Sequence, residues 1–201
     1  MQSSNTFSGS LTVNGGNLVV NGSLSGSSAS VENGGTLSGD GFIGPAVVHA
    51  GGTLASDANL LSIHSGPLVF ETDSKLKIEI KGAATDGVAV VGNVTLSGTI
   101  VLNIEITDTV AEGVTYTLLN STGGISGYAE GARFSYSGNP LDEGERFSVT
   151  SGLFSQEFTI GYGADGGNDV VLTAVPEPRG ALLFLTATAL AGLGRVRPRR
   201  L

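Results

Sequence analysis

The feature that most constrains the fold is a repeated unit in residues 1–60, where short apolar segments flank a Gly-Gly pair. The segment Val31-Glu32-Asn33-Gly34-Gly35-Thr36-Leu37 recurs 17 positions later as Val48-His49-Ala50-Gly51-Gly52-Thr53-Leu54. An earlier copy, Thr12-Val13-Asn14-Gly15-Gly16-Asn17-Leu18, stands 19 positions before it. Units this short cannot bury their own apolar faces, so copies must stack to form one continuous core. The repeat therefore predicts a right-handed parallel β-helix built from coils of about 20 residues, with glycine and asparagine at the tight corners.

Regularly spaced apolar residues favour packed repeats over a flexible Gly/Ser linker. These residues are Leu11, Leu18, Val20, Leu24, Val31, Leu37, Val47 and Leu54. In this alignment, Val13 of the first copy corresponds to Glu32 of the second copy and to His49 of the third. We expect residues 1–60 to form Gly-rich β-solenoid repeats.

Residues 61–174 contain clearer strand patterns. Apolar and polar residues alternate perfectly in Lys75–Lys81, which predicts that Leu76, Ile78 and Ile80 point inward. The segment 99–106 alternates in the same way. Further strands are expected at Tyr116–Leu119, Phe147–Val149, Phe158–Tyr162 and Val170–Leu172.

The loop-rich segment Gly123–Pro140 contains Tyr128, Phe134 and Tyr136, which we expect to pack on the end of the core. No helical period of useful length occurs before Pro176. The prediction for residues 61–174 is therefore a region continuous with the repeats that ends in an irregular C-terminal β cap. The whole class is all-β.

The tail, residues 175–201, combines three unlike segments. Pro176 and Pro178 end any strand that enters from upstream and favour an extended backbone. The uncharged segment Gly180–Gly194 is rich in Ala and Leu and spans about 22 Å as a helix, against about 30 Å for a hydrocarbon core. Arginines on both flanks can snorkel, and the arginine-rich end 195–201 places the C-terminus in the cytoplasm. We expect one short C-terminal transmembrane helix at 180–194; an ordinary core helix is the alternative.

The motif 175–178, Val175, Pro176, Glu177 and Pro178, together with the short apolar helix and the arginine-rich end, resembles the PEP-CTERM sorting signal of Gram-negative bacteria. The resemblance implies an exported protein that is anchored in the inner membrane until an exosortase-type sorting protease cleaves near the motif. The mature protein then reaches the cell surface or the extracellular space. The residues that would orient the helix in the membrane are Arg195, Arg197, Arg199 and Arg200.

The segment Glu32–Gly41 is similar to the autotransporter-associated β-strand repeat of bacterial surface proteins. Matching landmarks of the C-terminal unit of such proteins occur at Gly87–Gly98, Tyr116–Leu119 and Asp165–Leu172. The two resemblances imply a surface or biofilm-matrix protein of structural or adhesin type, with exopolysaccharide among its partners.

Composition narrows the function classes. The chain has no cysteine, which excludes disulfides and thiolate chemistry. Residues 1–178 carry all 18 acidic residues against five basic ones, and this charge argues against nucleic acid as a partner. The segment Met1–Phe7 has neither the basic nor the apolar region of a signal peptide, so we expect the signal peptide and further repeats upstream of Met1.

Two patterns were considered as metal sites. The segment Asp165–Leu172 carries a single displaced copy of the glycine–aspartate unit that binds calcium in β-rolls, and a glycine turn before the last strand explains it better. His49 and His64 are the only histidines and lack the spacing of zinc ligands. We therefore predict no metal and no cofactor.

The sequence predicts that the protein is not an enzyme. It has no Gly-x-Ser-x-Gly elbow, although composition alone does not exclude a serine triad. The carboxylates Asp142, Glu143 and Glu145 cluster beside Arg146, and we interpret them as a solvated turn. The alternatives to a structural protein are a polysaccharide-active β-helix enzyme and a fragment of an autotransporter passenger.

Overall fold

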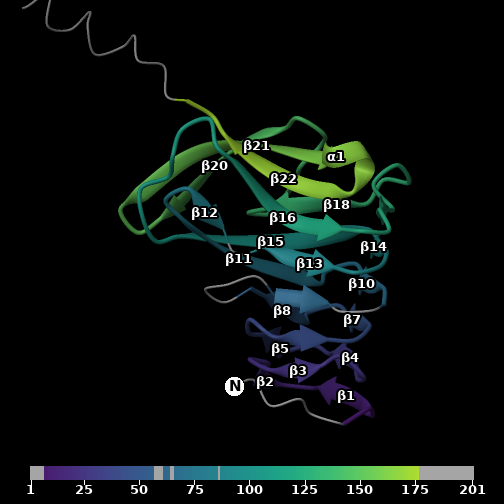
Figure 1. Ribbon diagram of the computed structural model, residues 1–201. Helices are drawn as coiled ribbons and strands as arrows, with labels where there is room; N and C mark the ends of the chain where they lie inside the picture. The colour runs from purple at the N-terminus through teal and green to yellow at the C-terminus, as the bar shows by residue number, and fades with distance from the viewer. Residues whose placement is uncertain (1–6, 57–60, 64–65, 86, 177–201) are drawn as a thin grey trace, which may run out of the picture.

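The structure, a computed structural model, describes residues 7–56, 61–63, 66–85 and 87–176. The described chain is all-β, and its one helix is the single turn α1 (Ala164–Gly167). As Figure 1 shows, the strands stack as a tower that rises from β1–β3 to a wider end formed by β20–β22.

The strands form three sheets, and from β1 to β18, apart from β12, successive strands along the chain join the three sheets in turn. The first sheet contains β1 (Ser10–Val13), β4 (Ser28–Val31), β7 (Ala46–Val48), β10 (Leu68–Phe70), β14 (Val94–Leu96) and β17 (Ile125–Ser126). The second contains β2 (Gly16–Val19), β5 (Gly35–Ser38), β8 (Thr53–Ala55), β11 (Lys75–Lys81) with β12 (Ala84–Thr85) paired to it, β15 (Thr99–Ile106), β18 (Arg133–Tyr136) and β19 (Asn139–Pro140). The third contains β3 (Ser23–Leu24), β6 (Phe42–Ile43), β9 (Leu61–Ile63), β13 (Val88–Val90), β16 (Thr115–Ser121), β22 (Asp169–Ala174), β21 (Phe154–Gly163) and β20 (Arg146–Ser151).

Successive coils pair in parallel and place like residues side by side. The clearest column consists of Leu18, Leu37, Leu54, Leu76 and Leu102, each in register with the next. The last four are at most 1% exposed. Because burying one leucine contributes about 1.5–3 kcal/mol, such columns supply much of the stability of the stack.

The predicted strands at 75–81 and 99–106 are β11 and β15, and their predicted faces are confirmed. Leu76, Ile78 and Ile80 are fully buried, while Ile104 is only partly buried. The charged residues of β11 do not lie at a sheet edge, because β11 lies between β8 and β15.

Two details of the predicted repeat alignment are wrong. Val13, rather than Thr12, lies in register with Val31, and the turn before Gly16 is one residue shorter than the turn before Gly35. In β7, Val48 is buried and Val47 is half-exposed. The run Ala46–Val48 has no polar alternation, so the sequence does not reveal which valine points inward.

The two glycines have different roles in the Gly34-Gly35 copy of the repeat, and the Gly51-Gly52 copy follows the same pattern. Gly34 has φ of 82°, in the left-handed region that favours glycine. Gly35 has no such backbone requirement, but a Cβ there would lie 2.1 Å from the carbonyl oxygen of Val13 in the preceding coil. The first glycine therefore makes the corner, and the second allows the coils to approach.

In the third sheet the parallel stack ends at β16, which pairs in parallel with β13 on one side and antiparallel with β22 on the other, while β17 and β18 still pair in parallel in the other two sheets. Strands β21 and β20 continue this antiparallel edge and form the cap. The aromatic residues expected to pack on the end of the core do so. Tyr128 and Phe134 stack on the two sides of Tyr162, with ring centroids 5.8 and 6.2 Å away.

Candidate functional site

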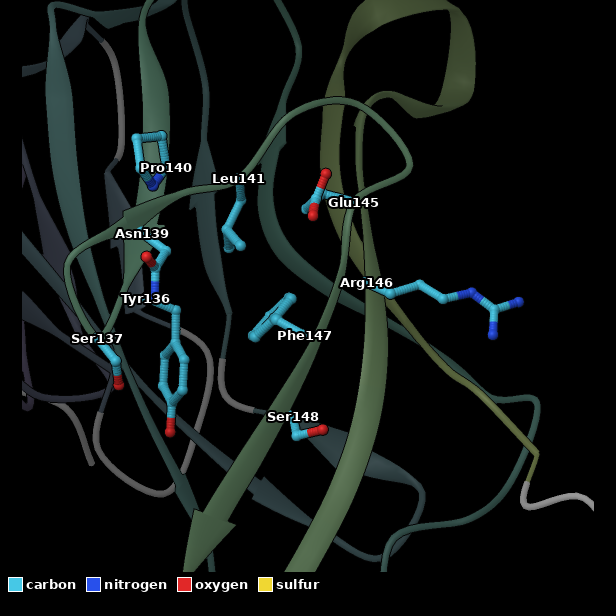
Figure 2. A pocket seen from close by; sticks show the side chains of 9 residues that line it. All are labelled: Tyr136, Ser137, Asn139, Pro140, Leu141, Glu145, Arg146, Phe147 and Ser148. Carbon is cyan, nitrogen blue, oxygen red and sulfur yellow. The ribbon is translucent and has the colours of Figure 1, made fainter.

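A cleft of about 360 Å³ lies in the cap. Figure 2 shows it between the β18–β19 hairpin on one side and β20 on the other. Its lining consists of Tyr136, Ser137, Asn139, Pro140, Leu141, Glu145, Arg146, Phe147 and Ser148. Its volume falls within the range of small-ligand pockets, about 300–1,000 Å³.

Two half-buried aromatic rings form the walls of the cleft. The ring centroids of Tyr136 and Phe147 lie 5.3 Å apart at an interplanar angle of 44°. Leu141 is only 2% exposed, and its side chain lies next to them (Figure 2). The cleft thus has an apolar interior that opens to solvent.

Polar side chains surround these rings. Asn139 and Glu145 are exposed, and together with the hydroxyls of Ser137 and Ser148 they provide hydrogen-bond donors and acceptors at the mouth. Figure 2 shows the Arg146 side chain directed away from the rings, and its guanidinium lies 3.6 Å from a carboxylate oxygen of Glu157.

Tyr162 fixes the hairpin that forms one wall. Its fully buried hydroxyl accepts a hydrogen bond from the backbone N–H of Phe134 and donates one to the carbonyl of Leu141, both 2.8 Å long. Burial raises the pKa of Tyr162 to about 12, although its hydrogen bond to Phe134 and the nearby Arg133 oppose this shift. The hydroxyl therefore stays neutral at physiological pH and ties both ends of the hairpin together.

The carboxylates of the turn before β20 have separate partners. Asp142 accepts a hydrogen bond of 2.9 Å from Arg133 Nε, and Glu143 accepts one of 2.7 Å from the backbone N–H of Tyr162. Of the three, only Glu145 lines the cleft. The turn is exposed as expected, but two of its carboxylates also hold the cap in place.

A second polar cluster connects three successive coils. Glu32, His49 and Glu71 directly follow the paired residues Val31, Val48 and Phe70. His49 Nδ1 lies 2.9 Å from Glu71 Oε2, and His49 Nε2 lies 3.0 Å from Ser30 Oγ and 3.6 Å from Glu32 Oε1.

Ser30, His49 and Glu71 contact one another in the order of a catalytic triad, in which a hydroxyl nucleophile is followed by a histidine base and an orienting carboxylate. However, the Ser30 hydroxyl donates its hydrogen bond to Glu32 Oε1, 2.6 Å away. Strand β4 is also paired on both sides, with β1 and β7, so its backbone N–H groups do not form an oxyanion hole. We therefore interpret this cluster as a polar clasp between coils.

The predicted sorting residues lie at the end of the described chain. Val175 donates its N–H to the carbonyl of Glu157 and accepts a hydrogen bond from Gln156 Nε2, each 2.8 Å long, and Pro176 is exposed. Glu177, Pro178, the segment 180–194 and the four orienting arginines, Arg195, Arg197, Arg199 and Arg200, lie outside the described residues, as does His64. Among the helices that the structure does describe, none is long and apolar enough to cross a bilayer.

The glycine turn predicted at Asp165–Leu172 is present as α1 and the glycines Gly166 and Gly167, which both have positive φ. Asp169 Oδ1 accepts a hydrogen bond from Asn120 Nδ2 at 2.9 Å. Within the described ranges, no group of three or more histidine or carboxylate side chains has a geometry that could hold a metal ion.

Sequence analysis did not predict the cleft or the clasp. Part of the clasp is visible in the sequence, because the 17-residue repeat aligns Glu32 with His49. Glu71 lies beyond the last copy of the motif, so the repeat does not indicate it. A comparison of the chain with protein-family models gave no match, and a comparison with curated proteins gave none either.

Proposed function

We propose that this is an exported β-repeat protein of structural or adhesin type, located at the cell surface or in the extracellular matrix. In this proposal the three parallel sheets form a right-handed parallel β-helix closed by the C-terminal cap. The observation that carries the proposal is the in-register stacking of like residues from coil to coil, as in the column from Leu18 to Leu102.

Stacked coils suit a scaffold because each coil contacts mainly its neighbours, so length can change by adding or removing repeats. The outer faces of the coils carry short polar residues, including Thr36 and Thr53 in register on the second sheet. The net charge of −13 over residues 1–178 keeps such a rod soluble outside a cell. These features support a scaffold or adhesin rather than a protein built around one reaction.

The position of the tail supports export and sorting. The last described strand, β22, ends at Ala174, and Val175 is the last described residue with a hydrogen bond to the cap. The Pro-Glu-Pro motif begins directly after Val175, and its prolines favour the extended backbone that a protease cleft accepts. We propose an exosortase-type protease as the partner that removes the apolar segment and the arginine-rich end.

Expression in a Gram-negative host that has an exosortase tests this proposal. The full chain, fused to a secretory signal peptide, should lose the residues after about Pro178 and leave the membrane fraction. Replacing Pro176 and Glu177 with alanine should leave the protein uncut and membrane-bound, whereas the matched change Ser148→Ala in the cap should not affect processing. An intact Arg199-Arg200-Leu201 end on released protein, detected by mass spectrometry, would refute the sorting hypothesis.

A further inference from the structure

We propose that the cleft between the β18–β19 hairpin and β20 binds a neutral polysaccharide, with one sugar ring held at the Tyr136–Phe147 pair. The site stands on the geometry of the cleft. The choice of a polysaccharide over other ligands rests also on the proposed function in an extracellular matrix.

The aromatic pair provides the stacking surface. The C–H groups on one face of a pyranose ring carry partial positive charge, and they pack against the negative face of an aromatic ring. Tyr136 and Phe147 are only half-buried, and their ring centroids lie 5.3 Å apart at an angle of 44°, so the two rings touch each other and together present one apolar surface to the cleft. Hairpin and strand hold the two rings in fixed positions before any ligand arrives, which lowers the entropic cost of binding.

The rim provides the hydrogen bonds that a sugar requires. The amide of Asn139 donates and accepts, and the carboxylate of Glu145 accepts from two neighbouring hydroxyls. Both side chains are exposed, and no side-chain hydrogen bond within the described protein occupies either of them. Alternating donors and acceptors around an apolar floor match the polar edge and apolar face of a sugar.

Charge selects a neutral polymer. The body of the protein carries 18 acidic residues against five basic ones. The one guanidinium beside the cleft, that of Arg146, is directed away from the rings and lies 3.6 Å from Glu157 Oε2. A uronate-rich chain would therefore enter a negative field without a cationic partner at the rings.

An extended peptide is the competing ligand for this cleft. Addition of a strand to a sheet edge requires a run of free backbone donors and acceptors. The edge strand β19 offers little of this, because it has two residues and one of them, Pro140, has no N–H. The other strand beside the cleft, β20, is a six-residue edge strand of the third sheet, so the titration must separate a peptide paired to β20 from a polysaccharide at the rings.

The test is a titration of the full ¹⁵N-labelled chain with cellohexaose, mannohexaose and hexagalacturonate, followed by amide NMR shifts. At least one neutral hexamer should shift the amides of Tyr136, Asn139 and Phe147, with a Kd in the millimolar range or tighter. Tyr136→Ala should weaken binding by about tenfold or more. Asn139→Ala changes an exposed side chain and should weaken binding with an unchanged thermal midpoint. The matched variant Asn103→Ala, at an exposed position on β15, should leave binding unchanged.

Four results would overturn the inference. They are no shift with either neutral hexamer at about 10 mM, shifts that map outside the cleft, preference for hexagalacturonate, and equal weakening by Asn103→Ala. Shifts along β20 with an unstructured decapeptide, but not with the hexamers, would assign the cleft to peptides instead. If the chain binds a hexamer but its tail is never processed, this inference stands and the sorting hypothesis is refuted. If the tail is processed but no hexamer binds, the sorting hypothesis stands and this inference is refuted.

Discussion

Leu76 of β11 lies in register with Leu102 of β15, and neither side chain is more than 1% exposed. In the same pair of strands, Ile78 lies in register with Ile104, and Lys77 with Asn103. Adjacent residues on one strand thus face opposite environments.

Ile78→Asp and Lys77→Asp test this alternation on adjacent positions. Ile78→Asp places a carboxylate among fully buried apolar side chains and should lower the free energy of unfolding by about 3–5 kcal/mol. Lys77 is exposed, and its ion pair with Glu105 measures 3.1 Å, so Lys77→Asp should cost less than about 1 kcal/mol. Urea unfolding measures both, and equal losses would mean that the faces of β11 are assigned wrongly.

Strand positions and inward faces were predictable wherever apolar and polar residues alternate, as in β11. A period of two distinguishes the two faces of a strand without tertiary information. The first repeat was misaligned by one residue at Val13, because its glycine-rich turn is one residue shorter than the turn before Gly35 but has the same kind of composition. Sequence periodicity records the length of a unit, but not where in the unit a residue is missing.

The cleft could not have been predicted from the sequence. Tyr136 and Phe147 lie on different sheets, and their approach depends on the cap, where β16 changes from parallel to antiparallel pairing. The loop-like composition of Gly123–Pro140 conceals β17, β18 and β19, which form only because neighbouring strands pair with them. Tertiary pairing therefore outweighs the local preference of this segment.

The clasp at His49 should contribute measurably to the stacking of coils. His49→Ala removes its contacts to Ser30 and Glu71 and leaves Glu32 and Glu71 without their shared partner, so it should cost about 1 kcal/mol. As a control, Lys77→Ala removes a pair in which both side chains are 51% exposed and should cost about 0–0.5 kcal/mol. A double-mutant cycle of His49→Ala with Glu71→Gln should give a coupling energy above about 0.5 kcal/mol. A coupling of zero would mean that the two side chains contribute independently.

The raised pKa of Tyr162 predicts loss of stability at alkaline pH. Its folded pKa is about 12, above the ordinary value of 10.0, and the main cause is burial. The unfolded chain therefore releases this proton first. The stabilisation is complete below about pH 10, and it falls by up to about 2 kcal/mol as pH rises toward 12. Burial also raises the pKa of Tyr116, which adds a loss of the same sign.

Urea unfolding at about pH 9 and about pH 11.5 measures this loss. The free energy of unfolding of Tyr162→Phe should fall less between the two pH values than that of the wild type. At neutral pH the same variant should be less stable by about 1–3 kcal/mol, because the Phe134 N–H and the Leu141 carbonyl lose their partner. Tyr136→Phe is the control, since its hydroxyl lines an open cleft, and it should change neutral stability by less than about 0.5 kcal/mol. An identical pH dependence of Tyr162→Phe and wild type would contradict the proposed role of Tyr162.

Two glycines of successive repeats, Gly35 and Gly15, should differ in their tolerance of a methyl group. At Gly35 a Cβ would lie 2.1 Å from the carbonyl oxygen of Val13, and this atom belongs to backbone held in the parallel ladder. Gly35→Ala should therefore force the two coils apart and cost about 2 kcal/mol or more. At Gly15, in the first described coil, a Cβ would have no neighbour within 4 Å, and its φ is not in the left-handed region. Gly15→Ala should be neutral or stabilising by up to about 1 kcal/mol, because alanine restricts the unfolded chain. Thermal and urea unfolding of the two variants compare them directly. Similar losses would show that the loss at Gly35 does not come from contact with the coil beneath it.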